Sequence, residues 1–219
     1  FVNEIVNTVL LVFVGLFTIV NPIGGAPIFL GFTRANTRSQ RSAIALRVAV
    51  NGFFLLLGSL FIGSHVLEFF GITVPVVRVA GGLVVTAFAW QLLHSGVDID
   101  PPPDGTTASG VTATMRDAFY PLTLPLTVGP GSIAVAITIG SQRPRGIEPM
   151  QTVILAGAAI VGLLAVSLTV YLCYRYAERL ATYLGDAGTN VLVRLSAFIL
   201  LCIGIQVMWS GWSALNAPA

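Results

Sequence analysis

Apolar runs of roughly 20 residues recur along the whole chain, and this is the length that spans the hydrocarbon core of a bilayer. In hydrocarbon every backbone polar group must be satisfied within the protein, so such runs fold as helices. Of the 219 residues, 55% are hydrophobic and only 9% are charged, which is too little charge to cover a water-soluble domain of this length. The sequence therefore predicts an all-α polytopic membrane protein embedded in a lipid bilayer.

Six transmembrane helices are predicted, separated by short polar segments. They cover about residues 4–32, 48–69, 74–93, 118–140, 152–174 and 191–215. The longest polar segment contains three prolines and four aspartates, and we expect little of it to pack. The chain accordingly divides into a first three-helix repeat (1–96), a Pro/Asp-rich loop (97–117) and a second three-helix repeat (118–219).

Two of the predicted spans contain residues that are hostile to a helix. The first span includes TIVNPIGGAPIFLGF (residues 18–32), and the fourth includes PLTLPLTVGPGSI (residues 121–133). Proline removes a backbone donor and glycine loosens the chain. One such kink can serve packing alone. Two of them favour a polar cavity at membrane depth, because the freed backbone groups need partners there.

The interruptions occupy matching positions in the two halves of the chain. Pro22 and Pro27 align with Pro125 and Pro130, each pair being separated by four residues. Four positions of the third and sixth spans also match: Arg78 with Arg194, Gln91 with Gln206, Ser95 with Ser210 and Gly96 with Gly211. Because each unit has three spans, the second must enter the membrane upside down. The sequence thus predicts two inverted three-helix repeats with spans one and four broken.

Interrupted spans at corresponding positions of two halves point to a binding site near the middle of the membrane. The N-terminus of a half-helix presents unpaired N–H groups and a positive dipole to an anionic group such as a carboxylate. Unwound carbonyls can accept hydrogen bonds from an ammonium group or bind a cation. Small residues at the interruptions suit a small ligand.

Arginine placement predicts the orientation of the chain. Most arginines lie in or beside the first, third and fifth loops: Arg34, Arg38, Arg41, Arg47, Arg116, Arg175 and Arg179. Cytoplasmic loops carry an excess of basic residues. We therefore expect these loops in the cytoplasm and both termini outside.

The motifs NPIGGAPIF (residues 21–29) and PLTLPLTVGPGSI resemble the two distinctive motifs of the MarC/SnatA family of bacterial and archaeal inner-membrane proteins. The resemblance in length, span count and repeat arrangement covers essentially the whole chain. It implies a multi-pass protein of the inner (cell) membrane that transports small neutral amino acids, typically glycine and alanine. It also implies a distant similarity to LysE-type exporters. The family takes its name from an antibiotic-resistance locus, but the resemblance does not imply a role in antibiotic resistance for this chain.

Carried over residue by residue, the resemblance places the substrate-binding residues in the two motifs. Gly25 is added to this predicted set because a residue without a side chain lets the backbone approach a ligand. The predicted set is Asn21, Pro22, Gly24, Gly25, Pro27, Thr123, Pro125, Thr127, Gly129, Pro130 and Gly131.

Four polar residues of the third and sixth spans leave two interpretations open. Arg78 and Arg194 either snorkel towards the membrane surface or hold exposed carbonyls of the broken helices along the transport path. For Gln91 and Gln206, hydrogen bonding between helices is favoured over ligand binding.

Other function classes find little support in the sequence. It contains no Ser/His/Asp arrangement or phosphate loop, so we expect no enzyme. His65 and His94 lack partners at metal-ligand spacing, and a net charge of +2 does not indicate nucleic-acid binding. We therefore expect no metal and no cofactor. No carboxylate lies at mid-membrane depth, so the sequence does not indicate whether H+ or Na+ is the coupling ion. A homo-oligomer is also left open.

The alternative function is a channel or an exporter of another small solute, a metal ion or a drug. A channel should show a ring of charged side chains or a carbonyl filter. A drug exporter should have a roomy aromatic pocket, whereas the motif residues here are small.

Overall fold

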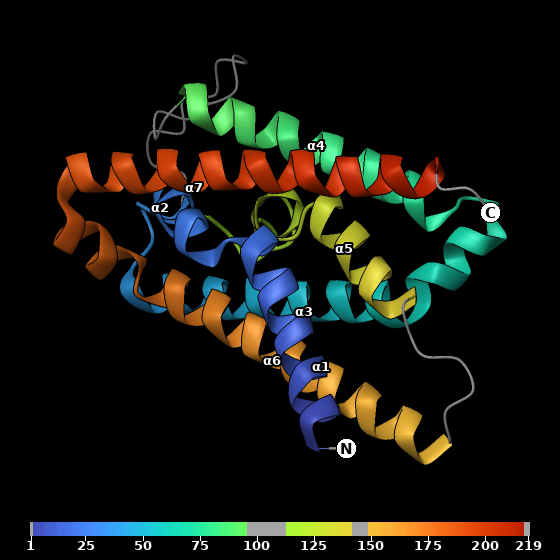
Figure 1. The fold of residues 1–219 in the computed structure, drawn as a ribbon. Helices are drawn as coiled ribbons and strands as arrows, with labels where there is room; N and C mark the ends of the chain where they lie inside the picture. The colour runs from blue at the N-terminus through green and yellow to red at the C-terminus, as the bar shows by residue number, and fades with distance from the viewer. Residues whose placement is uncertain (1, 96–112, 142–148, 217–219) are drawn as a thin grey trace.

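The structure is a computed structural model that describes residues 2–95, 113–141 and 149–216. All of its regular structure within these ranges is helical (Figure 1). The first half of the chain forms α1 (Val2–Val20), α2 (Pro22–Phe32), α3 (Arg38–Phe69) and α4 (Val74–Ser95). The second half forms η1 (Leu122–Thr127), α5 (Pro130–Ser141), α6 (Pro149–Arg175) and α7 (Ala177–Leu215).

Within the described ranges, five helices are long and apolar enough to cross a membrane: α1, α3, α4, α6 and the Ala187–Leu215 part of α7. Large apolar side chains such as Leu10, Phe54 and Leu168 are exposed on their outer faces, as contact with lipid requires. The predicted all-helical membrane protein is therefore confirmed. The fourth predicted span is not one long helix, because it is divided between η1 and the 12-residue α5. The count of six spans stays a prediction.

The first interruption is confined to one residue, Asn21. Its backbone adopts the left-handed conformation (φ 45°, ψ 60°), and its side-chain oxygen accepts a hydrogen bond from the Gly24 N–H at 3.2 Å. Pro22 occupies the first position of α2, where a missing N–H is tolerated. The helical bonds resume at once, since the Gly25 N–H donates to Asn21 O at 2.9 Å. The result is a capped kink between α1 and α2.

The second interruption extends over several residues. Leu124 is extended (φ −106°, ψ 125°) within η1, and Val128 is extended again (φ −118°, ψ 94°). The Val128 N–H donates to Thr123 O, five residues back, at 2.8 Å. The hydroxyl groups of Thr123 and Thr127 also donate to carbonyls five residues back, which are Ala118 O and Leu122 O. Threonine hydroxyls thus find backbone acceptors within the interrupted segment itself.

α4 and α7 lie side by side and run antiparallel (Figure 1). Glycines allow the two backbones to approach closely, as is typical of membrane helix pairs. A Cβ atom at Gly82 would lie 2.6 Å from Gly204 O, and a Cβ atom at Gly211 would lie 2.7 Å from Pro75 O. The third helices of the two halves therefore form one tightly packed pair.

Hydrogen bonds join the first, third and fifth loops at one end of the bundle. The Asn36 side chain pairs with both backbone groups of Ala113, at 2.9 and 3.0 Å. The buried Arg41 donates to Glu178 Oε2 at 2.8 Å and to the carbonyl of Thr33 at 3.2 Å. The first turns of α3 and α7 and the segment that precedes α3 are thus held together.

Candidate functional site

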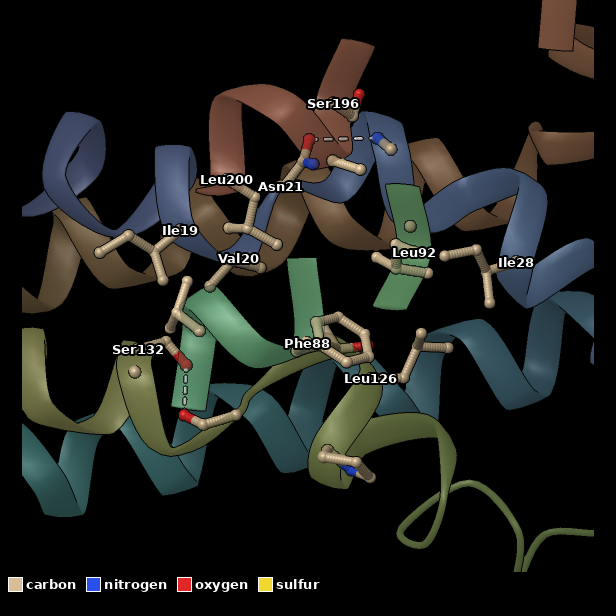
Figure 2. Close-up of a pocket in the computed structure, with 18 of the residues that line it drawn as sticks. Ile19, Val20, Asn21, Ile28, Phe88, Leu92, Leu126, Ser132, Ser196 and Leu200 are labelled. Atoms are coloured by element: carbon tan, nitrogen blue, oxygen red, sulfur yellow. Dashed lines mark hydrogen bonds between the residues drawn. The ribbon is translucent and has the colours of Figure 1, made fainter. Parts of the chain in front are cut away.

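A cavity of about 320 Å³ lies between the two interrupted segments. Its wall combines the α1–α2 junction, the η1–α5 junction and faces of α4 and α7 (Figure 2). Eight of the residues predicted to bind substrate line it: Asn21, Gly24, Gly25, Pro125, Thr127, Gly129, Pro130 and Gly131. Gln91 lines it too. The structure therefore brings both motifs to one cavity, and that these residues bind substrate stays a prediction.

The remaining predicted site residues lie outside the cavity wall. Pro22, Pro27 and Thr123 are buried in the interrupted segments, where they shape the backbone. Arg78 donates from Nε to Thr138 Oγ1 of α5 at 3.1 Å, so it ties α4 to α5. Its predicted counterpart Arg194 is exposed on α7, as is Gln206. The two arginines thus have different surroundings.

Several cavity-lining residues were missed by sequence reasoning. Figure 2 shows Asn21 near Ser196 on one side of the cavity and Ser132 on the other, and Phe88 and Leu126 also line the cavity. Ser132 directly follows the second motif's Gly131, so the motif could have been extended to it. Phe88 and Ser196 lie on α4 and α7, in spans that carried no interruption to mark them.

Tyr174 of α6 contacts both interrupted segments from outside the cavity. Its ring is fully buried and stacks on Phe29 of α2, with centroids 4.5 Å apart. Its hydroxyl lies 2.9 Å from Thr127 Oγ1. Because Thr127 gives its single hydroxyl proton to Leu122 O at 2.7 Å, Tyr174 is the donor in this pair. A Cβ atom added at Gly25 would lie 2.7 Å from the tyrosine hydroxyl.

Two helix ends of opposite polarity meet at the cavity. Gly131 and Ser132 belong to the first turn of α5, before its first intrahelical bond from the Ile133 N–H to Gly129 O. At the other end α1 ends at Val20, and the Gly24 N–H, which in a continuous helix pairs with the Val20 carbonyl, donates to the Asn21 side chain. An N-terminus and a C-terminal carbonyl edge therefore border the same space.

The described residues that line the cavity include no charged side chain. Hydroxyl, amide and backbone groups supply its polarity, and Ser132 Oγ donates to Gly129 O at 2.9 Å. Burial of an unpaired ion would be costly in such surroundings, whereas a zwitterion can pair both of its charges with helix ends. Among the described residues, no group of three or more His, Cys, Asp or Glu side chains is placed to hold a metal ion.

Comparison with known proteins identifies the family. The family described as "MarC family integral membrane protein" matches residues 6–215. The chain belongs to the MarC family. The membrane protein YvbG of Bacillus subtilis is 30% identical over 206 residues, which cover 91% of this chain and 92% of YvbG. The inner membrane protein MarC of Salmonella typhimurium is 30% identical over 199 residues, or 90% of each chain.

The match to the family therefore confirms the resemblance that the two motifs indicate. MarC of Citrobacter koseri, at 29% identity over 199 residues, is likewise named as an inner membrane protein. The chain is a multi-pass integral membrane protein, and neither the family description nor these relatives' names indicate an enzyme. No solved structure is significantly similar to this chain.

Proposed function

We propose that this MarC family protein transports small neutral amino acids of the glycine and alanine type by alternating access around the cavity. One observation carries the proposal: two interrupted segments, far apart in the sequence, line one cavity with helix ends of opposite polarity and, among the described lining residues, no charged side chain. Interrupted helices that meet near the middle of the membrane are typical of secondary transporters.

In the proposed complex the substrate carboxylate lies at the N-terminus of α5, against the N–H groups of Gly131 and Ser132. The ammonium group lies at the C-terminal edge of α1, against the Val20 carbonyl, with the Asn21 amide beside it. A volume of about 320 Å³ lies at the small end of ligand pockets, which span about 300–1,000 Å³, and this favours a small substrate.

Helix packing supports the six-span inverted repeat as part of this proposal. In the inverted repeat, η1, α5, α6 and α7 are the counterparts of α1, α2, α3 and α4. Helices that pack together therefore have counterparts that also pack together. For example, α2 packs on α7 as α5 packs on α4, and α2 packs on α6 as α5 packs on α3. The antiparallel α4–α7 pair also fits a two-fold axis that lies in the membrane plane.

We also propose that the arginine-rich end faces the cytoplasm, with both termini outside. The bonds from Asn36 to Ala113 and from Arg41 to Glu178 support a common side for the first, third and fifth loops. Labelling of single cysteines introduced at Arg34 and at Ser213 in intact cells tests this orientation. We expect a membrane-impermeant reagent to modify only the second position, and the reverse pattern would invert the topology.

Counterflow in proteoliposomes tests the function. Vesicles loaded with unlabelled alanine should accumulate labelled glycine and alanine, and unlabelled lysine or glutamate inside should not drive this accumulation. Uptake of ions without saturation would instead indicate a channel. Counterflow of a metal ion or a drug, but of no amino acid, would identify an exporter of another solute.

A further inference from the structure

A second cavity, of about 580 Å³, opens at the arginine-rich end of the bundle, where α3 begins, α6 ends and α7 begins. It shares no lining residue with the cavity between the interrupted segments. Three arginines and two tyrosines contribute to its wall: Arg38, Arg175, Arg179, Tyr171 and Tyr176. Such a concentration of guanidinium groups at the end of the membrane spans favours an anionic ligand.

The acidic residue in the wall, Glu178, supplies one negative charge, and that charge is shared between Arg41 and Arg38. Its Oε2 atom accepts a hydrogen bond at 2.8 Å from Arg41, which is buried behind the cavity. Arg38 lies farther away, with Nε at 3.8 Å from the same oxygen, and its side chain is 74% exposed. Because the wall contains three arginines and one carboxylate, the cavity keeps a net positive charge.

Tyrosine rings hold the other two arginines in place. The Arg175 guanidinium lies 5.6 Å from the centroid of the Tyr171 ring and 5.7 Å from that of Tyr176, and it donates to the Tyr171 hydroxyl. The Arg179 guanidinium lies 5.3 Å from the Tyr176 centroid. A guanidinium held beside a ring keeps further N–H groups that do not contact the ring, and the fork of these groups matches phosphate oxygens.

The apolar surface beside the cavity is suited to acyl chains. Leu46 of α3 lines the cavity and is itself exposed, and Leu168 and Leu172 are exposed on α6, which packs against α3. A ligand with a phosphate and an aliphatic tail could therefore use both surfaces. We propose that this cavity binds the phosphate of an anionic phospholipid, whose acyl chains lie along the outer faces of α3 and α6.

Native mass spectrometry of the purified full chain in a neutral detergent tests the proposal. Phosphatidylglycerol, phosphatidylcholine and inorganic phosphate are added in separate titrations. We expect a saturable phosphatidylglycerol adduct and a rise in melting temperature, with neither effect from phosphatidylcholine or phosphate. The double variant Arg175→Gln/Arg179→Gln should bind phosphatidylglycerol roughly ten-fold more weakly. The matched control Arg34→Gln/Arg47→Gln removes the same charge from exposed positions outside the cavity and should bind as the wild type does.

Each contrary outcome overturns the proposal. Equal stabilisation by inorganic phosphate and phosphatidylglycerol would assign the cavity to a soluble anion. Equal binding of phosphatidylglycerol and phosphatidylcholine by the wild type would show that charge plays no part, whether or not the variant folds. Equal weakening in both double variants would indicate attraction by overall charge rather than by this cavity.

Discussion

The two interrupted segments satisfy the backbone groups of a broken helix in different ways. The break between α1 and α2 is local: one left-handed residue, Asn21, ends one helix and caps the next with its own side chain. The break between η1 and α5 is extended, and it relies on hydroxyl groups of Thr123 and Thr127 and on a hydrogen bond from Tyr174 of α6.

The difference determines how each segment can be perturbed. Removal of one cap should disturb the first break alone, because its bonds are contained within a few residues. The second break depends on a distant helix, so a change on α6 should reach it. Tyr174 also stacks on Phe29 of α2, and it therefore couples the two breaks through one side chain.

The largest expected effect comes from adding bulk at either break. Gly129→Val adds bulk to the cavity wall, with its Cβ 3.3 Å from Pro125 O, and Gly25→Val forces its Cβ to 2.7 Å from the Tyr174 hydroxyl. Each should abolish alanine counterflow while the protein still inserts into the membrane. The control is Gly157→Val on the exposed face of α6, where a Cβ meets nothing within 4 Å. Unchanged alanine flux in both cavity variants would mean that the substrate binds elsewhere.

Substitution of Asn21 separates the cap from the proposed ligand contact. Loss of the amide should weaken alanine binding roughly ten-fold, equivalent to about 1.4 kcal/mol. Asn21→Gly keeps the left-handed backbone without strain and should cost only a few tenths of a kcal/mol in stability. Asn21→Ala should cost about 1–2 kcal/mol more, because alanine resists this conformation. Binding calorimetry measures the alanine affinity. If Asn21→Gly and the wild type bind alanine equally well, the Asn21 amide does not contact the substrate.

Tyr174→Phe tests the coupling between the two breaks. It keeps the stacking on Phe29 but removes the donor to Thr127, which should lower the free energy of unfolding by about 1 kcal/mol. It should also relieve the contact that Gly25→Ala creates, so the double variant should be more stable than the sum of the single effects predicts. Thermal melting measures both effects. The control is Tyr183→Phe, which changes an exposed tyrosine. Strict additivity would show that Gly25 and Tyr174 act independently.

The smallest expected effect lies outside both breaks, in the Pro/Asp-rich loop. Most of this loop (residues 96–112) lies outside the described residues, so its predicted lack of packing stays a prediction. Deletion of residues 98–109 should leave melting temperature and counterflow unchanged. A well-folded deletion variant that no longer transports would assign this loop a functional role.

Sequence reasoning located the cavity because proline and glycine mark a broken span wherever it packs. It named Asn21 and Gly129, which both line this cavity, since backbone interruptions need a polar space in the membrane. That these residues bind substrate stays a prediction. It missed Tyr174 and Ser196, whose proximity to the breaks comes from helix packing rather than from any local pattern. It also predicted equivalent roles for Arg78 and Arg194, but side-chain surroundings depend on neighbours that a repeat does not conserve.

Substrate protection of a cavity cysteine tests most directly whether the two breaks form one binding site. Cys173 and Cys202 are first replaced by alanine, and Ser132→Cys is then labelled with a small maleimide in proteoliposomes. The matched control is Ser141→Cys at the other end of α5, where the native serine also donates to a carbonyl three residues back but lies outside the cavity. We predict that alanine slows labelling at position 132 several-fold and leaves labelling at position 141 unchanged. Saturating alanine that is transported but protects neither position would contradict the proposed site.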